Sequence, residues 1–128
     1  MGKFYIVVAL VVGLGYWART HVHSASILEF ARTRENEDWG HRIEYYWGVI
    51  QFTRDRFPEA EKAFDQLLAS ASTAYYLAPA ARIKLGRVCK KSLKWHKALR
   101  QFEFYVKTWP DGEQIRLAEK NVMLIKNR

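Results

Sequence analysis

The histidines and the single cysteine are the residues of this sequence that suggest metal or nucleophilic chemistry. His21 and His23 are separated by one residue and offer two imidazole ligands, but no third ligand is near them in the sequence. His41 and His96 stand alone and are expected to be solvated on helices. Cys89 is the only cysteine, so an internal disulfide and multi-cysteine metal motifs are excluded, and a buried thiol is expected. We therefore expect no metal ion and no other cofactor.

Motifs of the common catalytic classes are missing from the sequence. There is no glycine-rich phosphate loop, nucleophile elbow, zinc-binding cluster or haem-attachment motif. The 128 residues are 49% hydrophobic and 15% aromatic, which favours a folded domain over disorder. The net charge of +8 favours anionic partners without choosing among lipid headgroups, acidic proteins and nucleic acid. These features together predict a non-enzymatic protein.

A basic run is the sharpest charged feature. Its members are Lys90, Lys91, Lys94, Lys97 and Arg100. One interpretation is a solvated turn and helix face, and the other is a surface that binds an acidic peptide. The sequence leaves both interpretations open.

The chain opens on an apolar segment. Residues 4–18 are uncharged and are flanked by Lys3 and Arg19. These 15 residues are fewer than the ~20 that usually span a bilayer, but flanking residues could extend the span, and aromatic residues lie at both ends. We expect residues 1–22 to form an uncleaved signal-anchor with one transmembrane helix. A cleaved signal peptide and a buried core helix are the alternatives.

Residues 23–40 are expected to connect the anchor to a folded domain. Ser26 and Glu29 fit a capping box at the start of a short helix, and Asp38 is placed to cap the next helix. This order predicts a single-pass membrane protein. The expected location is a bacterial inner membrane, with the domain in the periplasm, and the alternative is a mitochondrial membrane. Positive charges on both sides of the segment leave its topology undecided.

Residues 41–128 contain an internal repeat. An offset of 38 residues aligns Trp47-Gly48 with Leu85-Gly86, Phe57 with Trp95, Ala60 with Ala98, and Phe64 with Phe102. Apolar residues at helical spacing, with Pro58 and Pro79 near two helix starts, predict a pair of antiparallel helices in each unit. We expect the small residues to let paired helices approach closely while the phenylalanines fill the space beside them.

These residues resemble the tetratricopeptide repeat (TPR) family. The family pattern of Leu-Gly, Ala-x-x-x-Phe and Pro is matched by Leu85-Gly86, Ala98, Phe102 and Pro110, whereas the first unit has Ser72 in place of the closing proline. The 38-residue period exceeds the usual 34 and is similar to the longer repeats of bacterial envelope proteins. The resemblance implies an all-α fold with repeats at about 41–73 and 79–111 and a capping helix at about 112–127. Asp111 is the expected cap of that last helix.

In the TPR family the first helix of each pair lines a concave groove. By that resemblance, the expected partner-binding residues are Tyr45, Val49, Phe52, Ile83, Arg87, Lys90 and Lys91. Apolar side chains beside cations suit an acidic helical or extended peptide.

Two functions are consistent with these features. The first is a scaffold or accessory subunit of a respiratory, photosynthetic or envelope-assembly complex, which contacts other subunits and, through residues 4–18, the lipid bilayer. The alternative is a membrane-anchored receptor or adaptor for acidic or amphipathic peptides. No nucleic-acid partner is expected, because no base-reading or phosphate-reading motif is present.

Overall fold

The chain is all-helical in the part that the computed structural model describes. That part comprises residues 2–21, 24–36 and 38–128, with the backbone alone for residues 18–21 and 24. The expected all-α class is confirmed there. The helices are α1 (Gly2–His21), α2 (Ser24–Arg32), α3 (Asp38–Thr53), α4 (Phe57–Ser70), α5 (Ala78–Lys91), α6 (Trp95–Thr108) and α7 (Ile115–Lys126).

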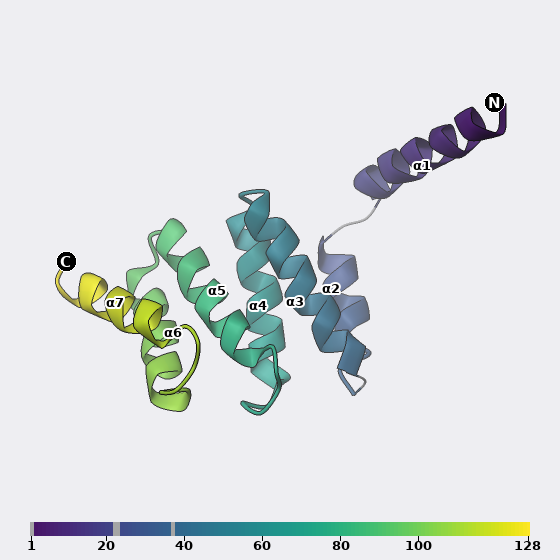
Figure 1. Cartoon of the computed structure of the whole chain (residues 1–128). Coiled ribbons are helices and arrows are strands. Elements are labelled where there is room, and N and C mark those ends of the chain that lie inside the picture. The colour runs from purple at the N-terminus through teal and green to yellow at the C-terminus, as the bar shows by residue number, and fades with distance from the viewer. Residues whose placement is uncertain (1, 22–23, 37) are drawn as a thin grey trace.

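The amino-terminal helix α1 corrects the prediction of a membrane anchor. At 1.5 Å per residue, the uncharged run 4–18 extends only about 22 Å, whereas the hydrocarbon core of a bilayer is about 30 Å thick. Across the described residues, no helix combines the length and the apolar character needed to cross a membrane. The predicted transmembrane helix, and with it the single-pass location in a bacterial inner or mitochondrial membrane, was therefore wrong. Figure 1 shows α1 standing apart from the other helices, and its side chains at 2–17 are exposed.

The second helix, α2, packs against α3 and α4. It buries Leu28 and Ala31 on that side, and the Gln66 side-chain amide on α4 donates a hydrogen bond to the Leu28 carbonyl at 2.6 Å. The helix starts at Ser24, two residues before the expected cap at Ser26. The next helix, α3, has Asp38 as its first residue, whereas the sequence placed Asp38 as the cap before the helix.

Two helix pairs follow, and the same glycine contact closes both. Helix α3 packs on α4 and α5 packs on α6, with α4 against α5 and α6 against α7 (Figure 1). A Cβ atom built on Gly48 would lie 2.7 Å from the Phe64 ring, and one built on Gly86 would lie 2.7 Å from the Phe102 ring. Because real side chains do not approach so closely, only glycine allows these crossings. The predicted steric role is confirmed for Gly48 and Gly86.

The turns inside the two pairs are also equivalent. Asp55 and Leu93 both adopt left-handed backbone, with φ of 58° and 61°. In each turn the next amide bonds back to a carbonyl five residues earlier, Arg56 to Gln51 and Lys94 to Cys89, as in a Schellman cap. Glycine is the usual residue in this conformation, so the sequence carried no signal for it.

Leu93→Gly is expected to raise the free energy of unfolding by about 0.5–1 kcal/mol. A left-handed leucine costs about 1–2 kcal/mol, part of which is offset by the greater entropy of glycine in the unfolded chain. Leu93 is 70% exposed, so little packing is lost. Urea denaturation measures the change. The control Leu124→Gly, on the exposed face of α7, should instead destabilise the protein by about 1 kcal/mol. Equal effects of both variants would contradict the assignment of strain to the turn.

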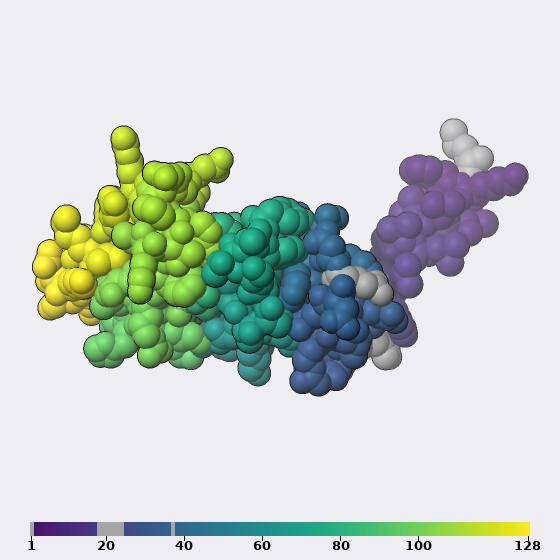
Figure 2. Space-filling view, turned by 90° about the horizontal axis from the view of Figure 1, so that it is seen from below, coloured from purple at the N-terminus to yellow at the C-terminus, as the bar shows by residue number. Residues whose placement is uncertain are grey.

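The core runs along the stacked pairs. Its largest fully buried apolar side chains are Tyr105, Phe64, Phe102, Leu67 and Leu85. Figure 2 shows the helices following one another in chain order from α2 to α7 along the molecule. Each pair therefore contacts only its neighbours, and the outer surface is large relative to the core.

The predicted helix starts are met at both prolines but not at the last helix. Pro58 and Pro79 lie in the first turns of α4 and α5. Helix α7, however, starts at Ile115, so the predicted cap at Asp111 was wrong. The hydroxyl of Tyr105 accepts a hydrogen bond from the Gln114 backbone N–H at 3.1 Å. This hydrogen bond stabilises the turn before Gln114, so that α7 begins only at Ile115.

Candidate functional site

The residues predicted to bind a partner divide into core and surface residues. Tyr45 and Ile83 are buried, and the ring centroids of Tyr45 and Phe64 are 6.1 Å apart, so a partner meets little of either side chain. Val49 and Phe52 are half-buried against the core. The remaining three predicted residues are cations on α5. Arg87 and Lys91 are exposed, and Lys90 is half-buried.

These cations line a hollow on α5, and Lys90 also borders a second hollow between α5 and α7. Arg87, Lys90 and Lys91 surround a hollow of about 290 Å³. Lys90 also borders a second hollow of about 430 Å³, whose other lining residues are Arg116, Leu117, Lys120, Asn121 and Leu124 of α7. We call the surface formed by Arg87, Lys90, Lys91, Arg116 and Lys120 the basic groove.

The charges of the basic groove are not neutralised by carboxylates. Within the described residues, none of its five cations forms an ion pair. Lys90 Nζ donates to Asn121 Oδ1 at 2.5 Å, and the Arg87 guanidinium lies 5.6 Å from the centroid of the Phe52 ring. Burial first and Arg87 second lower the pKa of neighbouring Lys84. A concave surface with this charge concentrates anionic ligands.

The basic run noted in the sequence is split by the fold. Lys94 and Lys97 turn to α4, where both pair with Glu61 at 2.9 and 2.8 Å and Lys97 also pairs with Asp65 at 2.8 Å. Only Lys90 and Lys91 reach the basic groove. The fold therefore divides the run into the ion-paired Lys94 and Lys97 and the groove residues Lys90 and Lys91, and periodicity alone could not predict this division.

Sequence reasoning missed the contribution of α7 to the groove. Arg116 and Lys120 are four residues apart and so share one face of α7. They lie outside the repeated units, and their proximity to Lys90 depends on how α7 packs. Helical spacing of the two cations was the only available signal.

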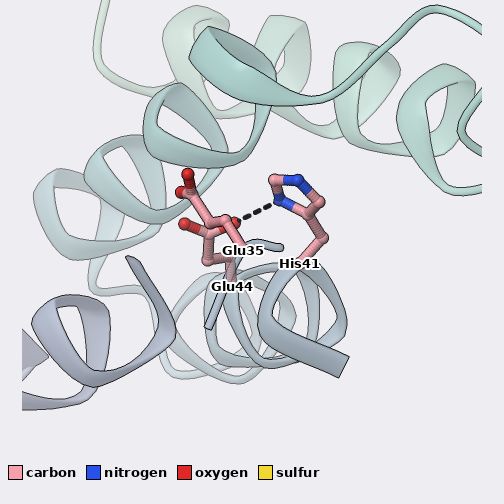
Figure 3. A group of neighbouring side chains, drawn as sticks. All are labelled: Glu35, His41 and Glu44. Carbon is pink, nitrogen blue, oxygen red and sulfur yellow. Dashed lines mark hydrogen bonds and ion pairs between the residues drawn. The ribbon is translucent and has the colours of Figure 1, made fainter. Parts of the chain in front are cut away.

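A second cluster, also missed, joins the turn after α2 to the first turns of α3. Glu35, His41 and Glu44 point toward one another in Figure 3, and their ligand atoms all lie within 4.8 Å of each other. Glu44 is fully buried, and its Oε1 is 2.8 Å from His41 Nδ1. Its Oε2 accepts a hydrogen bond from Gln66 Nε2 at 2.5 Å. His41 was expected to be solvated, but its side chain is only 11% exposed because α3 turns it toward this cluster.

The environment of Glu44 favours its protonated form. Burial, followed by a hydrogen bond that protonated Glu44 donates to the Glu35 carboxylate, raises the pKa of Glu44 to about 7, against the opposing effect of hydrogen bonds with His41 and Gln66. Near neutral pH, Glu44 is therefore protonated for part of the time.

Comparison with known proteins returned no match. No family model matches the chain, and neither curated proteins nor solved structures give a significant match. The function has to be argued from the residues that the fold brings together.

The other sequence candidates carry no chemistry in the described part of the chain. His23 lies outside the described residues, and only the backbone of His21 is described. Cys89 is fully buried in the core, as expected, and burial raises the pKa of its thiol to about 11. A thiol with so high a pKa is a poor nucleophile at neutral pH.

Proposed function

We propose that this chain is a non-enzymatic, TPR-like scaffold that binds an acidic segment of a partner protein in the basic groove. The observation that carries the proposal is the set of five cations, contributed by α5 and α7, that line adjoining hollows and form no ion pair with any carboxylate among the described residues. Charge complementarity makes an acidic segment the ligand that this surface favours.

Two repeated features support the TPR-like description. The contacts Gly48–Phe64 and Gly86–Phe102 are 38 residues apart, and so are the left-handed residues Asp55 and Leu93. Stacked helix pairs of this kind present one helix of each pair on a shared face, which suits peptide docking.

The groove itself favours binding over catalysis. Its lining combines the five cations with the aliphatic Leu117 and Leu124 and the amide of Asn121. No hydroxyl, thiol, imidazole or carboxyl group is among these lining residues. Of the two functions considered from the sequence, the peptide adaptor uses this surface directly, whereas an accessory subunit could use any face of the domain.

Charge reversal in the groove is expected to weaken binding selectively. The probes are two labelled amphipathic peptides, one of glutamate and leucine and one of lysine and leucine. The parent should bind the acidic peptide, more weakly as salt rises, and not the basic peptide. Arg87→Glu with Lys90→Glu should raise the Kd for the acidic peptide about tenfold or more, because about 1.4 kcal/mol of lost attraction corresponds to a factor of ten. Fluorescence anisotropy measures the Kd.

A matched variant separates groove binding from net charge. Arg100→Glu with Lys107→Glu on α6 changes the net charge by the same amount at exposed positions that line a different hollow, of about 620 Å³, between α6 and α7. Its Kd should stay within about twofold of the parent value. An equal loss of affinity in both double variants, with circular dichroism showing all proteins folded, would reject the groove as the binding site.

A further inference from the structure

The cluster of Glu35, His41 and Glu44 has the composition of a metal site. Two carboxylates and one imidazole are ligands that Zn²⁺ accepts, and three protein ligands leave a position for water. The ligand atoms lie within 4.8 Å of one another, whereas tetrahedral zinc holds its ligands roughly 3.3 Å apart. Small rotations about the side-chain bonds of the two glutamates would bring the ligand atoms to the shorter separation that zinc requires. We propose that these three side chains bind a divalent transition-metal ion, with Zn²⁺ as the best fit.

The charges around the cluster favour a cation at this place. Glu44 is fully buried and faces a second carboxyl group, that of Glu35. In the described part of the chain no lysine or arginine pairs with either of them. Two neighbouring carboxylates with one imidazole are poorly compensated, and a divalent ion would neutralise them.

Neighbouring groups hold the ligands in place. His41 and Glu44 are three residues apart on α3, so they share one helix face, and Glu35 approaches from the turn before it. Gln66 Nε2 donates to Glu44 Oε2 and to the Leu28 carbonyl, which fixes the carboxylate from the side opposite to His41. Outer hydrogen bonds of this kind are typical of metal sites, where they orient the ligands.

A purely structural ion pair explains only part of this arrangement. A His41–Glu44 pair would account for two of the three side chains and would stabilise α3 locally. In that pair Glu35 contacts Glu44 favourably only while Glu44 is protonated, because two ionised carboxyl groups repel each other. A bound metal ion gives each of the three a role.

Calorimetric titration of the full chain with ZnCl₂, after metal is stripped with chelator, tests the site. His21 and His23 could bind zinc by themselves, so the titration uses the His21→Ala/His23→Ala variant as its reference protein. We expect one equivalent of Zn²⁺ to bind this reference with a Kd of about 10 μM or tighter, and Mg²⁺ at equal concentration not to displace it, since Mg²⁺ prefers oxygen ligands. The melting temperature should rise with added zinc.

Ligand variants decide the outcome. In the reference protein, Glu35→Gln and His41→Ala should each raise the Kd for Zn²⁺ about tenfold or more, because a lost ligand typically removes at least 1.4 kcal/mol of binding. His96→Ala, at an exposed histidine on α6, should leave the Kd unchanged. Glu35 lies in a turn, so Glu35→Gln keeps the test valid if His41→Ala fails to fold. Zinc binding that is absent from the reference protein, or unchanged in Glu35→Gln, would overturn the proposal.

Discussion

Gly86→Leu is expected to lower the free energy of unfolding by about 3 kcal/mol or more. The new Cβ would lie 2.7 Å from the Phe102 ring, and the rest of the side chain has to enter the same space between α5 and α6. Phe102 is fully buried in the core, so its ring has no free volume to move into. Overpacking of this kind costs roughly 1–3 kcal/mol and occasionally more, and leucine adds several carbons at once. Urea denaturation followed by circular dichroism measures the loss.

Two further variants test whether the loss comes from this contact. Gly15→Leu in α1 is the matched control, because nothing lies within 4 Å of a Cβ built there, and it should change stability by less than about 1 kcal/mol. Phe102→Ala alone is expected to cost about 3–5 kcal/mol through the cavity that it creates. Combined with Gly86→Leu, it should cost clearly less than the sum, because leucine then occupies part of that cavity. Additive losses would mean that Gly86 and Phe102 do not share a packing site.

Glu44 is expected to make the metal-free protein less stable as pH rises from about 4.5 to 7. Its pKa is about 7 in the folded chain against 4.5 for an unperturbed glutamate, so the folded state holds the proton more tightly. The sign follows from linkage: the contribution is fully present below pH 4.5, is lost progressively up to pH 7, and is constant above that. The shift corresponds to a loss of about 3 kcal/mol. Urea denaturation across this range, in the presence of chelator, measures the change.

Glu44→Gln isolates this contribution. Glutamine is a neutral mimic of the protonated side chain, so the variant should match the parent near pH 4 and exceed its stability by about 3 kcal/mol near pH 8. Glu113→Gln, at an exposed carboxylate for which no contact is seen in the described structure, is the control and should track the parent at every pH. A stability difference between Glu44→Gln and the parent that does not vary with pH would show that folding does not raise the pKa of Glu44.

Local signals in the sequence were sufficient for the helix pairs. Pro58 and Pro79 stand in the first turns of α4 and α5, and helical spacing of apolar residues located α3 to α7. The steric role of Gly48 and Gly86 was also predictable, because a repeat exposes positions where only small residues occur. Each of these features depends on the backbone and on neighbours along the chain.

Other predictions failed because they depended on tertiary packing or on the length of an apolar segment. The apolar run at the start is uncharged, but it is too short for the membrane span that was expected of it. Tyr45 and Ile83 have the spacing of groove residues, yet their side chains face the core. His41 looked like an isolated surface histidine until the turn before α3 brought Glu35 beside it. In each case burial depended on elements distant in sequence or on total length.

Sequence alone therefore determined the helical class, the repeat and the close approach of the paired helices, because periodicity, proline and glycine act locally on the backbone. Tertiary structure alone decided which cations remain unpaired and which carboxylates meet. Lys94 and Lys97 are neutralised by α4, whereas Lys90 joins Arg116 and Lys120 of α7. The physical reason is that the electrostatic environment of a side chain is set by groups within a few ångströms in space, and stacking of the helices determines which groups those are.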